Sequence, residues 1–253
     1  MRHNDDTDPL QYDVIGARFE ESKSTAAFSA ADTYTLLTVL DQLGGVKGLD
    51  VLDLACGYGF NTRLLARAGA RRTVGVDISA EMIRLARAHD PEDTDGAEIE
   101  YVVADAADLP PLGSFDLATA VYLFNYAADR TALHAMFRAI RGTLRVGGRL
   151  LAVVPNPGAF PHVDWSPYGI RIHARIPEGD APILEASFLT DPPVPFRFRE
   201  WPHAEFAEAA VEAGFASVSW QPSRTPSPEG ARDEAYWTTY RESPVSSLMI
   251  CTA

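Results

Sequence analysis

Short apolar runs alternate with helix-like patterns through the middle of the chain. The run Val51–Leu54 is followed, after a glycine-containing turn, by residues 61–70, whose apolar side chains fall on one side of a helix. Apolar residues at helical spacing also predict a helix from about Asp129 to Gly147–Gly148. Repeated strand and helix units with short connections predict an α/β fold with a doubly wound, Rossmann-like, mostly parallel sheet of seven strands. The strands are expected near 50–54, 73–76, 99–103, 115–121, 149–154, 217–220 and 247–252.

The alternation stops at Pro155. The proline-rich segment 156–201 contains three short β-rich pieces, at 169–176, 183–189 and 195–201, which predict a small antiparallel insert. Two helical patterns, at 12–24 and 30–43, precede the first strand and suit a helical cover. We therefore expect a single domain, 1–253, made of an N-terminal cover (1–45), a core (46–155), the insert (156–201) and the C-terminal part of the sheet (202–253).

The turn after the first strand has the composition of a ligand-binding loop. Gly57 and Gly59 let the backbone pass close to a ligand, and Asp77 ends the next strand 18 residues after Gly59 (77 − 59). An acid at that place can take both hydroxyls of a ribose. A dinucleotide fingerprint would need a third glycine where Thr62 stands, so the pyrophosphate form is not predicted. A plain strand-to-helix turn is the other interpretation of these residues.

Composition and charge narrow the function classes. The chain has 253 residues, 46% of them hydrophobic, and a formal net charge of −13, which disfavours nucleic acid and acidic membrane surfaces as partners. No apolar run has membrane-spanning length, and the first residues, MRHNDDTD, lack the apolar core of a signal peptide. With two cysteines, Cys56 and Cys251, a reducing cytoplasm is the expected location. Carboxylates do not converge after the fourth strand, so we expect no metal.

Five motifs in order resemble the class I S-adenosylmethionine-dependent methyltransferases. They are DLACGYG at 53–59, VGVDIS at 74–79, EMIRLAR at 81–87, ADAADLP at 104–110 and LRVGGRLL at 144–151. The segments YDVIGARFEESK, VYLFNYA and YWTTYRESP look, more narrowly, like bacterial small-molecule methyltransferases similar to the one of toxoflavin biosynthesis.

The resemblance implies S-adenosylmethionine as cofactor and S-adenosylhomocysteine as product. It implies that Asp53 holds the amino group of the cofactor, Asp77 its ribose, and Asp105 with the Ala106 amide its adenine. Phe19, where relatives often carry tyrosine, and Tyr12 would shield the methyl group. The implied cofactor-binding residues are Tyr12, Phe19, Asp53, Ala55, Gly57, Gly59, Asp77, Ile78, Met82, Asp105, Ala106, Ala120 and Val121.

The insert is where this fold usually keeps its acceptor pocket. His162, Asp164 and His173 are candidates for a catalytic general base there, although each also suits a surface polar residue or a turn cap. Aromatic residues exceed what a solvated loop region needs, so an aromatic acceptor slot is expected. Its candidate lining is Tyr122, Tyr126, Trp165, Tyr168, Trp201 and Trp237.

The predicted function is methyl transfer to nitrogen or oxygen of a small, aromatic or heteroaromatic metabolite, in secondary-metabolite biosynthesis, by a monomer or homodimer. Two alternatives stay open at this point. One is a non-catalytic S-adenosylmethionine-binding protein, in which the cofactor residues persist without turnover. The other is a nicotinamide-dependent oxidoreductase, which would share the glycine turn and Asp77 but would leave Asp105 without a role.

Overall fold

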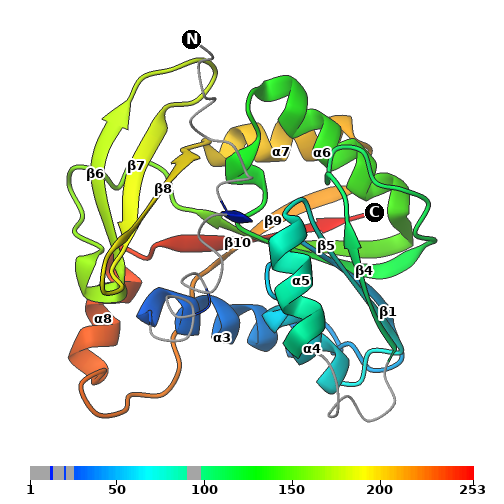
Figure 1. The fold of residues 1–253 in the computed structure, drawn as a ribbon, viewed down its shortest axis with the longest axis horizontal. Helices are drawn as coiled ribbons and strands as arrows, with labels where there is room; N and C mark the ends of the chain where they lie inside the picture. The colour runs from blue at the N-terminus through cyan, green and yellow to red at the C-terminus, as the bar shows by residue number, and fades with distance from the viewer. Residues whose placement is uncertain (1–11, 14–19, 21–25, 90–97) are drawn as a thin grey trace.

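The main sheet of the protein is doubly wound. A computed structural model describes residues 12–13, 20, 26–89 and 98–253, and among these seven strands form a sheet in the order β3-β2-β1-β4-β5-β10-β9 (Figure 1). Neighbours from β3 to β5 pair in parallel, and β10 runs antiparallel to both β5 and β9. The predicted fold class is confirmed. The strands are β1 (Asp50–Leu54), β2 (Arg72–Asp77), β3 (Glu98–Val103), β4 (Phe115–Val121), β5 (Leu144–Pro155), β9 (Ser217–Pro222) and β10 (Ser246–Thr252).

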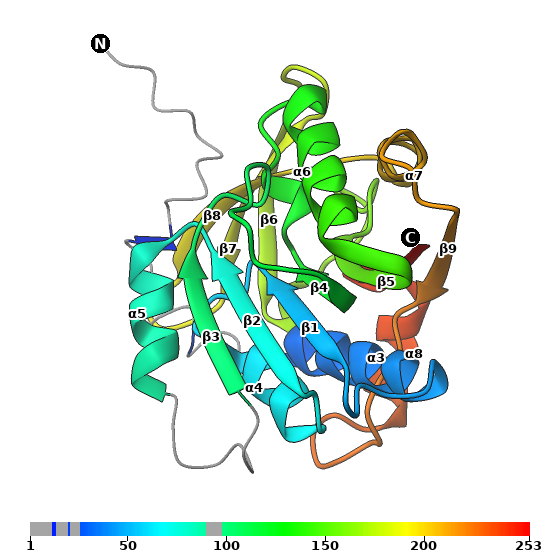
Figure 2. The same cartoon turned by 90° about the vertical axis from the view of Figure 1, so that its right-hand side faces the viewer.

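Helices cover both faces of this sheet, because the central strands are apolar on both sides. On one face, α6 (Arg130–Thr143) and α7 (His203–Glu212) bury residues such as Phe137 and Phe206 against Leu52 and Ala152. On the other face, α3 (Ala27–Gln42) and α4 (Phe60–Arg67) pack around Val51 and Leu151. The helix α5 (Ala80–His89) lies next to β2 and β3 (Figure 2).

The insert forms a second, antiparallel sheet, as predicted. Its strands are β6 (Ile170–Ile176), β7 (Ile183–Phe188) and β8 (Val194–Arg199), with β7 in the middle. Apolar residues of this sheet share a core with the first turn of α3 and with α8 (Glu234–Glu242), and the short helix η2 (Ser166–Tyr168) lies in the same cluster. The insert sheet therefore stands beside the main sheet rather than as a separate unit (Figure 1).

Two expectations about the elements change. The helix expected to reach Gly147–Gly148 ends at Thr143, because these glycines lie within β5, where the pairing with β4 shifts between Phe115 and Leu117. Gly147 has a φ of +77°, a left-handed conformation that glycine adopts without steric cost at an irregularity in a strand. The helix expected at 12–24 falls mostly outside the described residues. The division into cover, core, insert and C-terminal part stays a prediction, with β6 to β8 all inside 156–201.

Candidate functional site

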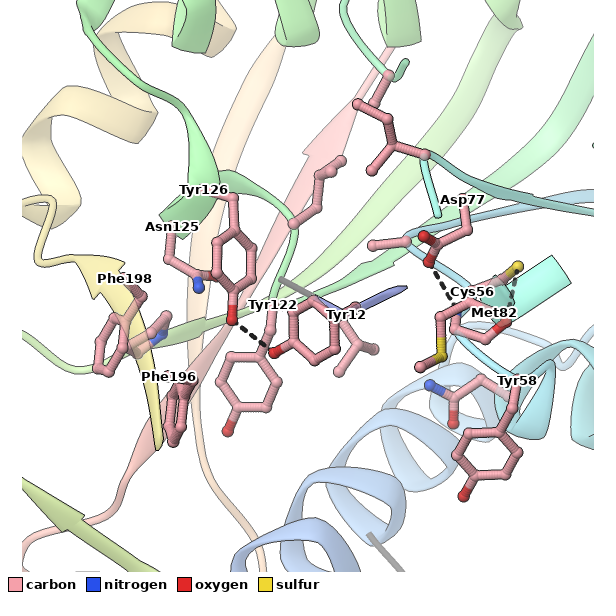
Figure 3. Close-up of a pocket in the computed structure, with 18 of the residues that line it drawn as sticks. Tyr12, Cys56, Tyr58, Asp77, Met82, Tyr122, Asn125, Tyr126, Phe196 and Phe198 are labelled. Atoms are coloured by element: carbon pink, nitrogen blue, oxygen red, sulfur yellow. Dashed lines mark hydrogen bonds between the residues drawn. The ribbon is translucent and has the colours of Figure 1, made fainter. Parts of the chain in front are cut away.

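One cavity lies between the carboxyl ends of the main sheet and the insert sheet (Figure 3). Its first part, here named the carboxylate end, is lined by the turn 55–58 after β1, by Asp77, Ile78 and Met82, and by residues 104–106 after β3. Its second part, the aromatic end, is lined by rings from several distant segments. They are Phe28, Tyr122, Tyr126, Trp165, Phe188, Phe196 and Phe198.

Asp77 is the central group of the carboxylate end. One of its oxygens accepts a hydrogen bond from the Gly57 amide at 2.8 Å and the other from the Ser79 amide at 2.9 Å. Burial raises the pKa of Asp77 to about 6, against the lowering effect of these two amides. Each carboxylate oxygen keeps a second lone pair, so the group can still accept two hydrogen bonds from a ligand in the cavity.

The second carboxylate of this end stands after β3. Asp105 is exposed at the cavity wall, and its Oδ1 accepts from the Ala107 amide at 2.8 Å. Ala106 follows it and is buried. Among the described residues no backbone amide is recorded as donating to Oδ2 of Asp105, so this oxygen can face a polar ligand group together with the backbone of Ala106. The parallel pairing of β2 with β3 brings Asp77 and Val103 to the same edge of the sheet.

The backbone turns sharply at two non-glycine residues in the cavity wall. Ala55 has a φ of +51° and Tyr122 a φ of +58°, a left-handed conformation that costs about 1 kcal/mol or more for such residues. Each directly follows a strand, β1 and β4, whose carboxyl ends are adjacent. The Tyr122 hydroxyl donates to buried Asp32 of α3 at 2.6 Å, which fixes its side chain. Strained residues of this kind cluster at ligand sites.

A pair of tyrosines separates the two ends. The hydroxyls of Tyr12 and Tyr126 are 2.6 Å apart, and the rings meet edge to face (Figure 3). Next to Tyr12, Asp13 accepts from the Ser79 hydroxyl at the start of α5, which ties this N-terminal segment to the carboxylate end. Burial raises the pKa of Tyr12 well above its usual value and that of Tyr126 to about 12. Both hydroxyls therefore stay protonated at neutral pH.

The aromatic end carries rings in near-parallel planes. Phe188 and Phe196 stack with centroids 4.0 Å apart and an interplanar angle of 10°, and Phe196 continues to Phe198 at 15°. Phe28 lies nearly parallel to Phe188, at 12°. Among the described residues that line the cavity, the charged ones are Asp77 and Asp105, both at the carboxylate end. The aromatic end therefore suits a flat, uncharged ligand.

Residues 51–148 match the family model described as a methyltransferase domain. This segment is similar to methyltransferase domains. It contains β2, β3, β4, all of β1 after Asp50, and the whole carboxylate end of the cavity. The expected likeness to class I methyltransferases is confirmed, and the narrower likeness to the toxoflavin-biosynthesis enzyme stays a prediction.

A curated relative shares about half of its length with this protein. The ubiquinone biosynthesis O-methyltransferase of Xanthomonas axonopodis pv. citri (strain 306) is 35% identical over 117 residues, which cover 45% of this chain and 46% of that one. The homologous protein of Xanthomonas euvesicatoria pv. vesicatoria (strain 85-10) is 35% identical over 119 residues, 46% of this chain and 47% of that protein. The chain thus spans about half the length of the curated relatives it matches.

Solved structures extend the likeness in fold to nearly the whole chain. The magnesium protoporphyrin IX methyltransferase of Synechocystis PCC 6803, with bound S-adenosylmethionine, has a TM-score of 0.63 and 16% identity, covering 99% of this chain and 98% of that one. A sugar N-methyltransferase from Streptoalloteichus sp ATCC 53650 has a TM-score of 0.61 and 19% identity, and the match covers 93% of this chain and 91% of that one. At such identities the likeness shows a shared fold.

Three predicted cofactor residues of the methyltransferase domain lie outside the cavity lining. Asp53 is buried and accepts hydrogen bonds from the hydroxyls of Thr62 and Thr119, both at 2.7 Å, so its carboxylate joins α4 to β4. A β-carbon on Gly59 would lie 2.5 Å from the Tyr101 hydroxyl, so this glycine is needed for packing. Ala120 is buried within β4. Phe19 lies outside the described residues. The other predicted cofactor residues line the cavity: Tyr12, Ala55, Gly57, Asp77, Ile78, Met82, Asp105, Ala106 and Val121.

The three candidate general bases also lie away from the cavity. His162 is exposed, Asp164 accepts from the Ser166 amide at 2.9 Å as a turn cap, and His173 bonds to the Ser187 hydroxyl at 2.9 Å. Hydrogen bonding from Ser166 lowers the pKa of Asp164. The turn-cap alternative describes Asp164 well, because its carboxylate accepts from the amide two residues further along the chain, as in an Asx turn. None of the three is placed to take a proton from a molecule in the cavity.

The predicted acceptor lining divides in two. Tyr122, Tyr126 and Trp165 line the cavity, whereas Tyr168, Trp201 and Trp237 are buried in the cores beneath it. The missed lining residues include Phe28 on α3, Phe188 on β7 and Asn125 in the short helix η1 (Phe124–Tyr126). The alternation of Val194, Phe196 and Phe198 on β8 could have indicated one inward face. No local pattern indicated Phe28, because its partners are far away in sequence.

Proposed function

We propose that this protein is an enzyme that transfers a methyl group from S-adenosylmethionine to a nitrogen or oxygen atom of a small, planar metabolite, releasing S-adenosylhomocysteine. The observation that carries the proposal is the Asp77 carboxylate, which lines the cavity at the end of β2 while two backbone amides hold it in place. The methyltransferase-domain match and the O-methyltransferase relatives support the reaction class.

The residues of the carboxylate end fit this cofactor in chemistry. Asp77 has lone pairs for the two ribose hydroxyls, and Ile78 and Met82 give an apolar surface for a flat base. The Asp105 carboxylate can accept a hydrogen bond from the adenine amino group, and the backbone amide of Ala106 can donate one to a ring nitrogen. At Gly57, with a φ of +55°, the backbone can approach the amino-acid part.

S-adenosylmethionine supplies a methyl group on a positively charged sulfur, whose S–C bond breaks with its electron pair as the bond to the acceptor atom forms. The protein has to align the acceptor and exclude water, which is worth up to about 7–11 kcal/mol in well-oriented reactions. The Tyr12–Tyr126 pair lies where the two ends meet and can enclose the reacting atoms.

Among the described lining residues, no group is suited to act as a general base. Burial raises the pKa of the Cys56 thiol well above its usual value, and the two tyrosines stay protonated for the same reason. Asp77 and Asp105 are at the other end of the cavity. We infer that the acceptor reacts through its own lone pair and that any proton it loses passes to water.

The alternatives of a nicotinamide oxidoreductase and a non-catalytic binding protein are less well supported. The Thr62 hydroxyl bonds to Asp53 at 2.7 Å, at the position where dinucleotide loops carry their third glycine. A cavity that continues from the carboxylate end into an aromatic end has room for a second ligand, which supports turnover.

We also propose a cytoplasmic location, a role in secondary-metabolite biosynthesis, a monomer or homodimer, and an acceptor that is not nucleic acid. Within the described part of the chain, no helix has the length and apolar character needed to cross a membrane.

The test is calorimetric titration of the protein with S-adenosylmethionine and, separately, with NADH. Asp77→Ala should strongly weaken the binding of S-adenosylmethionine, whereas Asp108→Ala, which removes an exposed acid nearby, should leave it unchanged. Methyl transfer is then followed by mass spectrometry with planar hydroxy- and amino-heterocycles. Absence of binding, or a preference for NADH, would overturn the proposal.

A further inference from the structure

Among the described residues, the cavity wall contains a buried polar atom without a hydrogen-bond partner. Asn125 is 2% exposed, and within the described part of the chain no group hydrogen bonds to its Oδ1. An unsatisfied buried acceptor costs about 1–3 kcal/mol. The residues on either side of Asn125 have other partners. Phe124 stacks on Phe137 in the core, with ring centroids 4.2 Å apart, and the Tyr126 hydroxyl pairs with that of Tyr12. Such an atom in a cavity wall indicates a ligand that satisfies it.

The position of Asn125 is fixed by its surroundings. It stands in η1, directly after β4, and η1 lies against β8. Figure 3 shows Asn125 at the aromatic end, between Tyr126 and Phe198. Asn125 belongs to the lining of the cavity, so a ligand bound at the aromatic end lies next to its side chain.

The surroundings of Asn125 restrict the ligand. The near-parallel rings of Phe188, Phe196 and Phe198 offer apolar faces and edges, and no charged residue among the described lining belongs to this end. A charged ligand would lose its hydration here without gaining a partner, which is strongly unfavourable. A flat ligand with a single donor group would bury its rings and pair with Asn125.

We propose that Asn125 determines acceptor specificity: its Oδ1 accepts a hydrogen bond from an N–H or O–H group of an uncharged, planar acceptor held against the stacked phenylalanines. This inference rests on the proposed function, which makes the aromatic end the acceptor site. A site that hydrogen bonds to a ligand discriminates strongly against an analogue without the donor, because its own polar atom is then left unpaired.

The test uses three probes of the same ring system in the presence of S-adenosylhomocysteine. They are 2-naphthol, which has a donor, 2-methoxynaphthalene, which has none, and 2-naphthoate, which is charged. We expect calorimetry or ligand-observed NMR to show that 2-naphthol binds about tenfold more tightly than either of the others. Asn125→Leu should reduce the ratio between 2-naphthol and 2-methoxynaphthalene to about one. Asn125→Asp, which keeps an oxygen at this place, should preserve the preference for 2-naphthol.

Several outcomes would overturn the inference: an unchanged ratio in Asn125→Leu, tightest binding of 2-naphthoate, or no binding of 2-naphthol to the unmodified protein. Thermal unfolding of each variant checks its fold, and Asn125→Ala removes the same oxygen if the leucine variant does not fold. Titration with S-adenosylhomocysteine alone separates the two proposals. If that ligand does not bind, the proposed function fails, whereas the naphthalene series still measures what Asn125 recognises.

Discussion

The two ends of the cavity recognise ligands by different means. The carboxylate end is built from the consecutive segment 55–106, and its polar contacts come from backbone amides and from two acids at strand ends. The aromatic end collects side chains from Phe28 to Val245, and its apolar wall contains the Asn125 amide oxygen, which has no hydrogen-bond partner in the described part of the chain. The difference indicates that the carboxylate end suits a ligand with several hydrogen-bonding groups, whereas the aromatic end suits a flat, mostly apolar ligand. Substitutions at one end should leave binding at the other end nearly unchanged.

The largest expected effect is the loss of cofactor affinity in Asp77→Ala. Hydrogen bonds to a charged group contribute about 1.5–3 kcal/mol each, so losing two should weaken S-adenosylmethionine binding by about 100-fold or more. Calorimetry measures this change. The affinity for 2-naphthol at the aromatic end should change less than about twofold, and a comparable loss there would mean that the two ends do not act separately.

Phe196→Leu should have the next largest effect, at the other end. The leucine removes a ring face that stacks on Phe188, so we expect about tenfold weaker binding of 2-naphthol and unchanged binding of S-adenosylmethionine. Phe215→Leu is a matched control, because Phe215 is buried in the main core and does not line the cavity. If both variants weaken the binding of 2-naphthol equally, general destabilisation of the protein is the cause.

The pH dependence of cofactor affinity comes from the carboxylate end. Burial raises the pKa of Asp77 from 3.8 to about 6, and only the ionised carboxylate accepts from both ribose hydroxyls. Affinity for S-adenosylmethionine should therefore fall below pH 6, by at most about tenfold per pH unit. Titrations at several pH values measure it, and Asp77→Asn should remove this dependence. A pH profile that is identical in the variant would contradict the assignment.

The raised pKa of Asp77 also makes the stability of the free protein depend on pH. Because the folded state of the free protein holds the Asp77 proton at pH values where the unfolded chain has lost it, this residue makes the free energy of unfolding decrease as pH rises from about 4 to about 6. Bound cofactor should reduce that loss.

The smallest expected effect is that of substituting the three polar residues of the insert that sequence analysis offered as general bases. His162→Ala, His173→Ala and Asp164→Asn should each change the rate of methyl transfer by less than about twofold, because none lines the cavity. Turnover at saturating cofactor measures this. A drop of about 100-fold in any one of them would assign that residue to the chemistry after all.

The two ends also differ in how far the sequence predicts them. Asp77 and Asp105 could be assigned to the cavity because strand ends and glycine turns follow local spacing. Asp53 has the same local pattern, but its partner Thr119 lies opposite it on β4, and this pairing depends on the register between strands. Phe28 reaches the cavity through contacts with distant segments, for which the sequence has no periodic signal, and Asn125 follows β4 in a short helix whose direction no local pattern predicts. The predicted fold relied on repeated short patterns and is confirmed.

A crystal structure of the protein with S-adenosylhomocysteine and 2-naphthol together would show directly which ligand occupies each end of the cavity. We expect the ribose hydroxyls on Asp77, the sulfur near the Tyr12–Tyr126 pair, and the naphthol rings along Phe196 with the hydroxyl at Asn125. A nucleoside bound at the aromatic end, or a naphthol bound outside the cavity, would contradict the division of the cavity into a cofactor site and an acceptor site.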